Sequence, residues 1–165
     1  MKNKTLFATL IIIFLIFMFG DSMTTTPGRS SGNGNPAILL LLPLSIFFIV
    51  LTFQWFIVFK DKMISKKTVI ILSLLVICHH VIGVYYQIMS FRSYRIFLAK
   101  VYEGQFGTTD WDYINSITSG LSIHINNQYF NINTYLLFLS LSLFIWLLSQ
   151  MIISWRRKMR EKKWE

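Results

Sequence analysis

The side chains best suited to chemistry in this chain are those of Cys78, His79 and His80, which lie together within a long apolar stretch. Imidazole and thiol groups bind metals, carry protons and act as nucleophiles. Two adjacent histidines on a helix point about 100° apart, so they are poorly placed to hold one metal ion. Cys78 is the only cysteine, which excludes an intramolecular disulfide. We therefore predict that the cluster serves packing and hydrogen bonding, with a proton, ligand, metal or haem site as the alternatives.

Helical spacing places His80 in a polar stripe. Residues seven apart lie on nearly the same face of a helix, and this spacing links His80 to Ser73 and to Gln87. In lipid such side chains turn towards neighbouring helices and form hydrogen bonds with them. His79, whose neighbours at the same spacing are apolar or aromatic, is expected to be the less important of the two histidines. The candidate intramembrane polar site comprises Ser73, Cys78, His79, His80 and Gln87.

The apolar segments lack the residues that membrane enzymes and ion-coupled transporters use. None of them contains Asp, Glu, Lys or Arg, although ionisable residues mark most intramembrane functional sites. The Cys-x-x-Cys-His spacing of haem attachment is absent, and no second span carries a histidine that could share a haem with His79 or His80. The sequence thus predicts neither an enzyme nor a cofactor.

Four apolar stretches dominate the chain and must position these residues. They cover roughly residues 6–20, 37–59, 68–89 and 134–155, and the last three reach the ~20 residues that cross a ~30 Å hydrocarbon layer. Hydrophobic residues make up 54% of the chain and charged residues 14%, well below the ~25% charge of a soluble domain. Backbone groups in lipid need internal partners, so each span is expected to be a helix. The predicted fold class is an all-α membrane protein, a four-span helical bundle.

The first segment, residues 1–21, is either a retained span or signal anchor, or a cleaved signal peptide. Its basic start and short apolar core suit a signal peptide, whose removal after about residue 22 would leave three spans. The large side chains of Met18 and Phe19 disfavour cleavage there, so retention is the preferred interpretation.

Basic residues are unevenly distributed between the connecting segments. Twelve of the sixteen Lys and Arg residues lie before the first span, between spans two and three, or after the fourth. Positively charged loops stay in the cytoplasm, so both termini are predicted to be cytoplasmic in a multi-pass protein of the cell membrane. The basic tail, residues 156–165, is interpreted as a topology anchor that contacts the lipid bilayer, and not as a nucleic-acid-binding arm. The twelve residues are Lys2, Lys4, Lys60, Lys62, Lys66, Lys67, Arg156, Arg157, Lys158, Arg160, Lys162 and Lys163.

Two segments are predicted to lie outside the membrane. Residues 22–36 are rich in Gly, Ser, Thr, Asn and Pro and are expected to form a flexible linker. Residues 37–89 then form a transmembrane hairpin, and residues 90–133 form the larger external loop. Within that loop, helical spacing of apolar residues predicts an amphipathic helix over 91–102. Apolar and polar residues alternate strictly before an Asn-Asn pair, and this pattern predicts a β-hairpin over 121–132.

These features favour a small, non-enzymatic protein of a bacterial cytoplasmic membrane. Its expected role is accessory: it would bind another membrane protein or a second copy of itself, as an interaction, immunity or envelope-stress component, with the external loop as the recognition surface. The alternative is an oligomeric transporter or channel component that uses the His80 stripe, since four spans are few for a pathway in one chain. A membrane enzyme or redox protein built on Cys78, His79 or His80 is the third hypothesis; it lacks a second ligand or catalytic partner.

Overall fold

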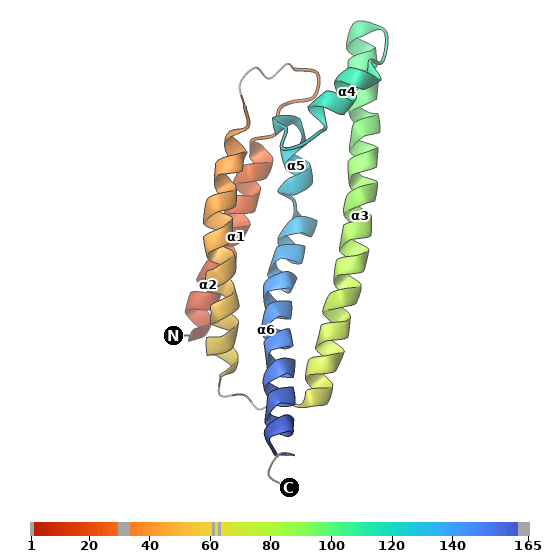
Figure 1. Ribbon diagram of the computed structural model, residues 1–165. Coiled ribbons are helices and arrows are strands. Elements are labelled where there is room, and N and C mark those ends of the chain that lie inside the picture. The colour runs from red at the N-terminus through yellow and green to blue at the C-terminus, as the bar shows by residue number, and fades with distance from the viewer. Residues whose placement is uncertain (1, 30–33, 61, 63, 162–165) are drawn as a thin grey trace.

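The structure is a computed structural model that describes residues 2–29, 34–60, 62 and 64–161 (Figure 1). Every regular element among these residues is a helix. The elements are α1 (Lys2–Ser22), the 3₁₀-helix η1 (Pro36–Leu40), α2 (Leu41–Phe59), α3 (Lys66–Phe106), α4 (Trp111–Ile117), the 3₁₀-helix η2 (Ile123–Ile125), α5 (Asn126–Tyr129) and α6 (Ile132–Glu161).

Four of the helical segments are long and apolar enough to cross a membrane, as the sequence predicted. They are Lys2–Ser22, Pro36–Phe59, Lys66–Phe106 and Ile132–Arg156. The second combines η1 with α2, and Pro43 lies in the first turn of α2, where a helix has no intrahelical partner for the missing N–H. Retention of α1 in the mature protein stays a prediction.

The four long helices do not form a closed bundle. α6 lies between α2 and α3 and packs on both, while α1 packs mainly on α2 (Figure 1). α2 and α3 approach each other only at the basic end, where side chains of both belong to one apolar cluster. The side of α6 between them is therefore covered by neither helix, and this arrangement is what creates the groove described below.

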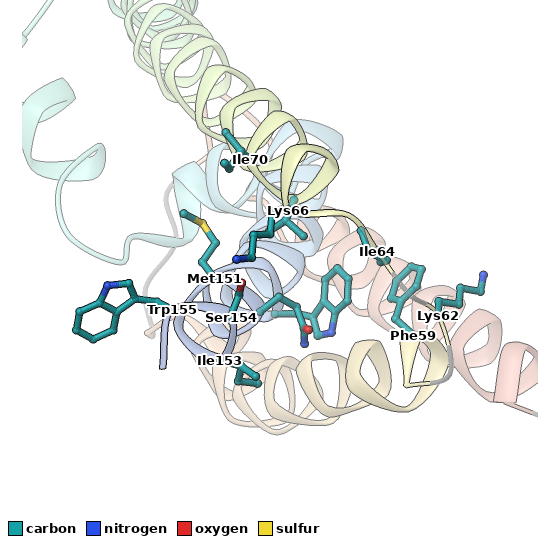
Figure 2. A pocket seen from close by; sticks show the side chains of 12 residues that line it. Phe59, Lys62, Ile64, Lys66, Ile70, Met151, Ile153, Ser154 and Trp155 are labelled. Atoms are coloured by element: carbon teal, nitrogen blue, oxygen red, sulfur yellow. The ribbon is translucent and has the colours of Figure 1, made fainter. Parts of the chain in front are cut away.

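The basic segments gather at one end of the molecule, which we call the basic end. The start of α1, the connection between α2 and α3, and the last turns of α6 all lie there (Figure 1). A pocket opens at this end between the first turns of α3 and the last turns of α6 (Figure 2). The predicted basic tail continues α6 as far as Glu161, and its residues 162–165 lie outside the described residues. The cytoplasmic orientation of this end stays a prediction.

The opposite end, which we call the cap end, is formed by α4, η2, α5 and the outer part of α3. The helix predicted over 91–102 is present, but it continues α3 and is not a separate interfacial helix. α3 starts where Ser65 accepts a hydrogen bond from the Thr68 N–H and stops at Gly107, whose φ is +79°. No proline interrupts the chain between these two signals. α4 packs back on α3 through Ile114, which is fully buried.

The predicted β-hairpin over 121–132 is wrong, because this segment forms η2 and α5. The Ser122 side chain accepts a hydrogen bond from the His124 N–H and so starts a helical turn. The Asn126 side chain bonds to other segments and does not serve a two-residue turn. A lone two-stranded hairpin also has no third strand to support it.

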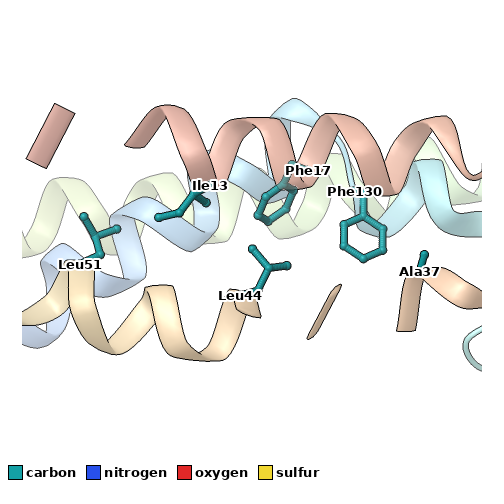
Figure 3. Close-up of a cluster of buried hydrophobic side chains, with 6 residues drawn as sticks. All are labelled: Ile13, Phe17, Ala37, Leu44, Leu51 and Phe130. Atoms are coloured by element: carbon teal, nitrogen blue, oxygen red, sulfur yellow. The ribbon is translucent and has the colours of Figure 1, made fainter. Parts of the chain in front are cut away.

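A buried cluster joins α1, η1 and α2 to the residue that precedes α6. Figure 3 shows side chains of α1 and α2 pointing towards one another, with Phe130 beside them. The Phe17 ring meets the rings of Phe130 and Phe138 edge-on, at centroid distances of 5.9 and 5.7 Å. Gly20 permits this approach, since a Cβ there would lie 2.4 Å from the Phe130 ring. The cluster consists of Ile13, Phe17, Ala37, Leu44, Leu51 and Phe130.

Candidate functional site

The two histidines of the predicted polar site differ in their partners. His79 Nδ1 lies 3.0 Å from Ser140 Oγ on α6, so it forms a direct hydrogen bond between helices. His80 Nδ1 instead lies 2.9 Å from the Val76 carbonyl oxygen of its own helix. A carbonyl only accepts, so Nδ1 of His80 carries the proton and Nε2 is an acceptor. That Nε2 is buried and has no hydrogen-bond partner among the described residues.

The structure thus reverses the expected ranking of the histidines as interhelical contacts. Spacing alone favoured His80, but the cross-helix bond is made by His79. The remaining members of the predicted site also divide. Ser73 is buried, with its Oγ 3.9 Å from Met151 Sδ of α6. Cys78 is exposed on the surface of α3 and joins neither contact.

Gln87 is the member of the predicted site with the most partners. Its Nε2 donates to the Gln128 carbonyl oxygen at 2.7 Å. Its Oε1 accepts from Asn133 Nδ2 at 3.1 Å and from Asn131 Nδ2 at 3.3 Å. Asn133 Nδ2 also donates to the Gly83 carbonyl oxygen at 3.0 Å. These bonds tie α3 to α5 and to the first turn of α6.

A second pair of amides connects the linker to the cap end. Asn35 Nδ2 donates to Asn126 Oδ1 at 2.7 Å, and Asn126 Nδ2 donates back to Asn35 Oδ1 at 3.1 Å. Asn126 also donates to the Met23 carbonyl oxygen at 3.3 Å, and its side chain is fully buried. The Thr25 N–H donates to the Ile123 carbonyl oxygen at 3.3 Å. The linker is therefore held at both ends, while its residues 30–33 lie outside the described residues.

We call these two groups of side chains together the amide network. Sequence reasoning missed all of it except Gln87, because the Asn-Asn pair was interpreted as a turn and the residues after it as a strand. A signal was present: five of the eight residues from 126 to 133 are Asn or Gln. So many hydrogen-bonding amides beside an apolar span indicate buried polar contacts. The network comprises Asn35, Gln87, Asn126, Gln128, Asn131 and Asn133.

A lateral groove of about 840 Å³ lies between α2 and α3, with α6 as its floor. One wall is a face of α2, with Leu41, Phe48 and Ile49 on it, and the ring of His80 contributes from α3. The groove is largely apolar along the helices. It reaches the cap end, where Leu121 and Tyr129 line it and are about half exposed.

The described residues were compared with the requirements of a metal site and the whole chain with known proteins. No three His, Cys, Asp or Glu side chains within the described part of the chain lie close enough to hold a metal ion. No protein-family model, curated protein or solved structure matches the chain. The residues that line the groove offer apolar packing and the hydrogen-bonding groups of His80, Asn35 and Asn126.

Proposed function

We propose that this chain is a non-enzymatic membrane protein that binds a transmembrane helix of another membrane protein in the groove between α2 and α3. The observation that carries the proposal is the uncovered side of α6. Along the groove α2 and α3 both pack on α6 but not on each other, so the bundle leaves a position for one helix open there.

The dimensions of the groove suit a helix. One wall runs along η1 and α2 and includes Ala37, Leu41, Leu44 and Phe48, which recur every three or four residues and so share one face. From Ala37 to Ile49 this face extends about 18 Å, or roughly three helical turns. Side chains from neighbouring helices interdigitate at such spacings when their axes lie 8–10 Å apart.

His80 adds a polar element to this apolar wall. Its Nε2 acceptor lacks a partner among the described residues, and an unpaired polar atom is costly in hydrocarbon. A serine, threonine or asparagine at the same depth on a bound helix would donate to it. The partner helix is therefore expected to be apolar with one such donor, and to extend outward so that it also contacts Leu121 and Tyr129.

Site-specific photocrosslinking in cells tests this proposal. Ile49 lines the groove, whereas Ile46 lies outside it on the same helix, and the two side chains are similarly exposed, at 57% and 54%. A photoreactive phenylalanine at position 49 is expected to yield a discrete adduct with another membrane protein, while the same probe at position 46 reacts with lipid. Equal adducts from both positions, or a protein adduct from position 46 alone, would refute the groove as the binding surface. An adduct of twice the mass of the chain would show that the groove binds a second copy of this chain and not another protein.

The proposal places the protein in a bacterial cytoplasmic membrane as an accessory or immunity-type component, with both termini in the cytoplasm. The gathering of the basic segments at one end supports that orientation. A reporter active only in the cytoplasm should work after Glu165 and fail when inserted at Gly120. The transporter or channel alternative finds less support, because Ser73, His79 and Gln87 are directed at α6 and α5 and already have partners there.

A further inference from the structure

We infer that the pocket at the basic end binds the phosphate headgroup of an anionic phospholipid. This site is separate from the groove and does not depend on the proposed partner helix. The pocket has a volume of about 640 Å³ and lies between the first turns of α3 and the last turns of α6. Small-molecule sites commonly have volumes of 300–1,000 Å³.

The polar side chains of the pocket match an anion. Lys62 and Lys66 line it, together with the hydrogen-bonding groups of Gln150 and Ser154. Figure 2 shows the Lys66 side chain extending from α3 towards Met151 and Ser154 of α6. No acidic side chain lines the pocket within the described part of the chain. Basic pockets between transmembrane helices bind lipid headgroups in this way.

The start of α3 adds a second reason to expect an anion. The N-terminus of a helix carries a partial positive charge and favours acidic residues in the first turn. α3 has no acidic residue there and begins with Lys66 and Lys67. Both lysines oppose the helix dipole, and Lys66 lines the pocket, so a bound phosphate group would be stabilised by the dipole and by the Lys66 ammonium group together.

The remaining lining favours a lipid over a soluble phosphate compound. Val69 and Ile70 continue the pocket along α3 beyond Lys66, into the apolar part of that helix. Trp146 and Trp155 also line it, and tryptophan is the residue that gathers at the level of lipid headgroups. A ligand with one anionic end and an apolar body would contact both parts of the pocket.

Native mass spectrometry of the full chain in neutral detergent tests the assignment, with phosphatidylglycerol, phosphatidylcholine and inorganic phosphate as separate probes. The double variant K62Q/K66Q removes both lysines of the pocket. The matched control K60Q/K67Q removes the same charge from the same connection, but neither residue lines the pocket. Thermal unfolding of each variant without added lipid checks that the fold is retained.

We expect phosphatidylglycerol to bind the natural chain at one saturable site, at least tenfold more tightly than phosphatidylcholine. K62Q/K66Q should lose at least tenfold in affinity, and K60Q/K67Q should stay within twofold. Equal losses of affinity in the two double variants would show that the overall positive charge attracts the lipid, and would overturn binding in the pocket. Saturable binding of inorganic phosphate with the same dependence on Lys62 and Lys66 would overturn the lipid as ligand. No preference for phosphatidylglycerol over phosphatidylcholine would overturn the anion site altogether.

Discussion

The cap end and the basic end hold the same helices together by different means. At the cap end, side-chain amides such as Asn35, Gln87 and Asn126 bridge α3, α5, α6 and the linker. At the basic end, the Phe59 ring stacks on Trp146 with centroids 4.6 Å apart and lies beside Trp55 at 6.1 Å. Among the described residues, one side-chain hydrogen bond joins the stack to α6, from Trp55 Nε1 to Ser142 Oγ at 3.0 Å.

The difference follows from the surroundings of each contact. Lipid is as apolar as leucine, so helices gain little hydrophobic free energy when they meet in a membrane. Close aromatic packing and a few hydrogen bonds must then supply the association. At the cap end, buried amides are costly unless every group is paired, so a fully paired set fixes one arrangement of the segments. The aromatic contacts at the basic end supply attraction between the helices. The paired amides at the cap end fix the positions of the segments relative to one another.

The largest effect is expected from Asn126→Ala at the cap end. The change removes the donor to the Met23 carbonyl and two of the hydrogen bonds of the Asn35 amide, which keeps its bonds to the Leu121 carbonyl and the Ala37 N–H. We expect it to lower the free energy of unfolding by about 2–3 kcal/mol, the scale for unpaired buried polar groups. Titration with a denaturing detergent measures it. Asn115→Ala, at an exposed position on α4, removes one surface hydrogen bond from Arg95 and should cost less than about 1 kcal/mol. If the two variants cost the same, the amide network does not stabilise the cap end.

Trp146→Leu probes the aromatic stack at the basic end. Trp146 is 3% exposed, and its ring rests on that of Phe59. Loss of the ring should reduce stability by about 1–2 kcal/mol through lost packing. Trp155→Leu is the control at the same end, since this side chain is 64% exposed and should change stability by less than about 0.5 kcal/mol. A larger loss for Trp146→Leu than for Asn126→Ala would reverse the comparison between the two ends.

A double-mutant cycle isolates the hydrogen bond within the stack. Trp55→Phe keeps an aromatic ring beside Phe59 but removes the donor to Ser142. Ser142→Ala removes the acceptor. Each change is expected to cost about 1 kcal/mol, and the double variant should cost little more than either alone, because both remove one bond. Additive losses would show that the Trp55–Ser142 bond contributes nothing.

The smallest effect concerns pH and is confined to the cap end. Burial lowers the pKa of His124 below the ordinary 6.5, so the folded protein binds this proton more weakly than the unfolded chain does. Below pH 6.5 the unfolded state takes up the proton first, and stability falls with pH down to the folded-state pKa. The thermal midpoint should therefore drop slightly between pH 7 and pH 5.5. His124→Asn should remove that portion of the drop, and an unchanged profile in this variant would contradict the assignment.

Much of the fold could be predicted because few backbone structures are stable within a membrane. An apolar run of about twenty residues is expected to form a helix that spans the membrane. The positions of the basic residues predict which connecting segments lie on the same side of the membrane. The orientation of Ser73 and Gln87 towards the other helices also followed from their spacing. These features depend on the local sequence and its solvent alone.

The cap end could not be predicted by the same reasoning. Alternation around His124 resembled a strand, whereas Ser122 caps a turn and His124 is buried by contacts distant in the chain. Asn35 and Asn126 are 91 residues apart, so neither indicates its partner locally. The exchange of roles between His79 and His80 has a similar origin. It depends on where α6 places Ser140, and spacing within α3 carries no information about that.

The unbroken length of α3 has a mechanical consequence. Its 41 residues make a rod of about 60 Å, twice the thickness of the hydrocarbon layer. The rod begins beside Lys66 in the basic-end pocket and carries α4 near its far tip (Figure 1). Rocking such a rod by about 5° about its start would move the tip by about 5 Å. A change in bilayer thickness that altered the tilt of α3 would therefore move α4 by several ångströms relative to the basic end.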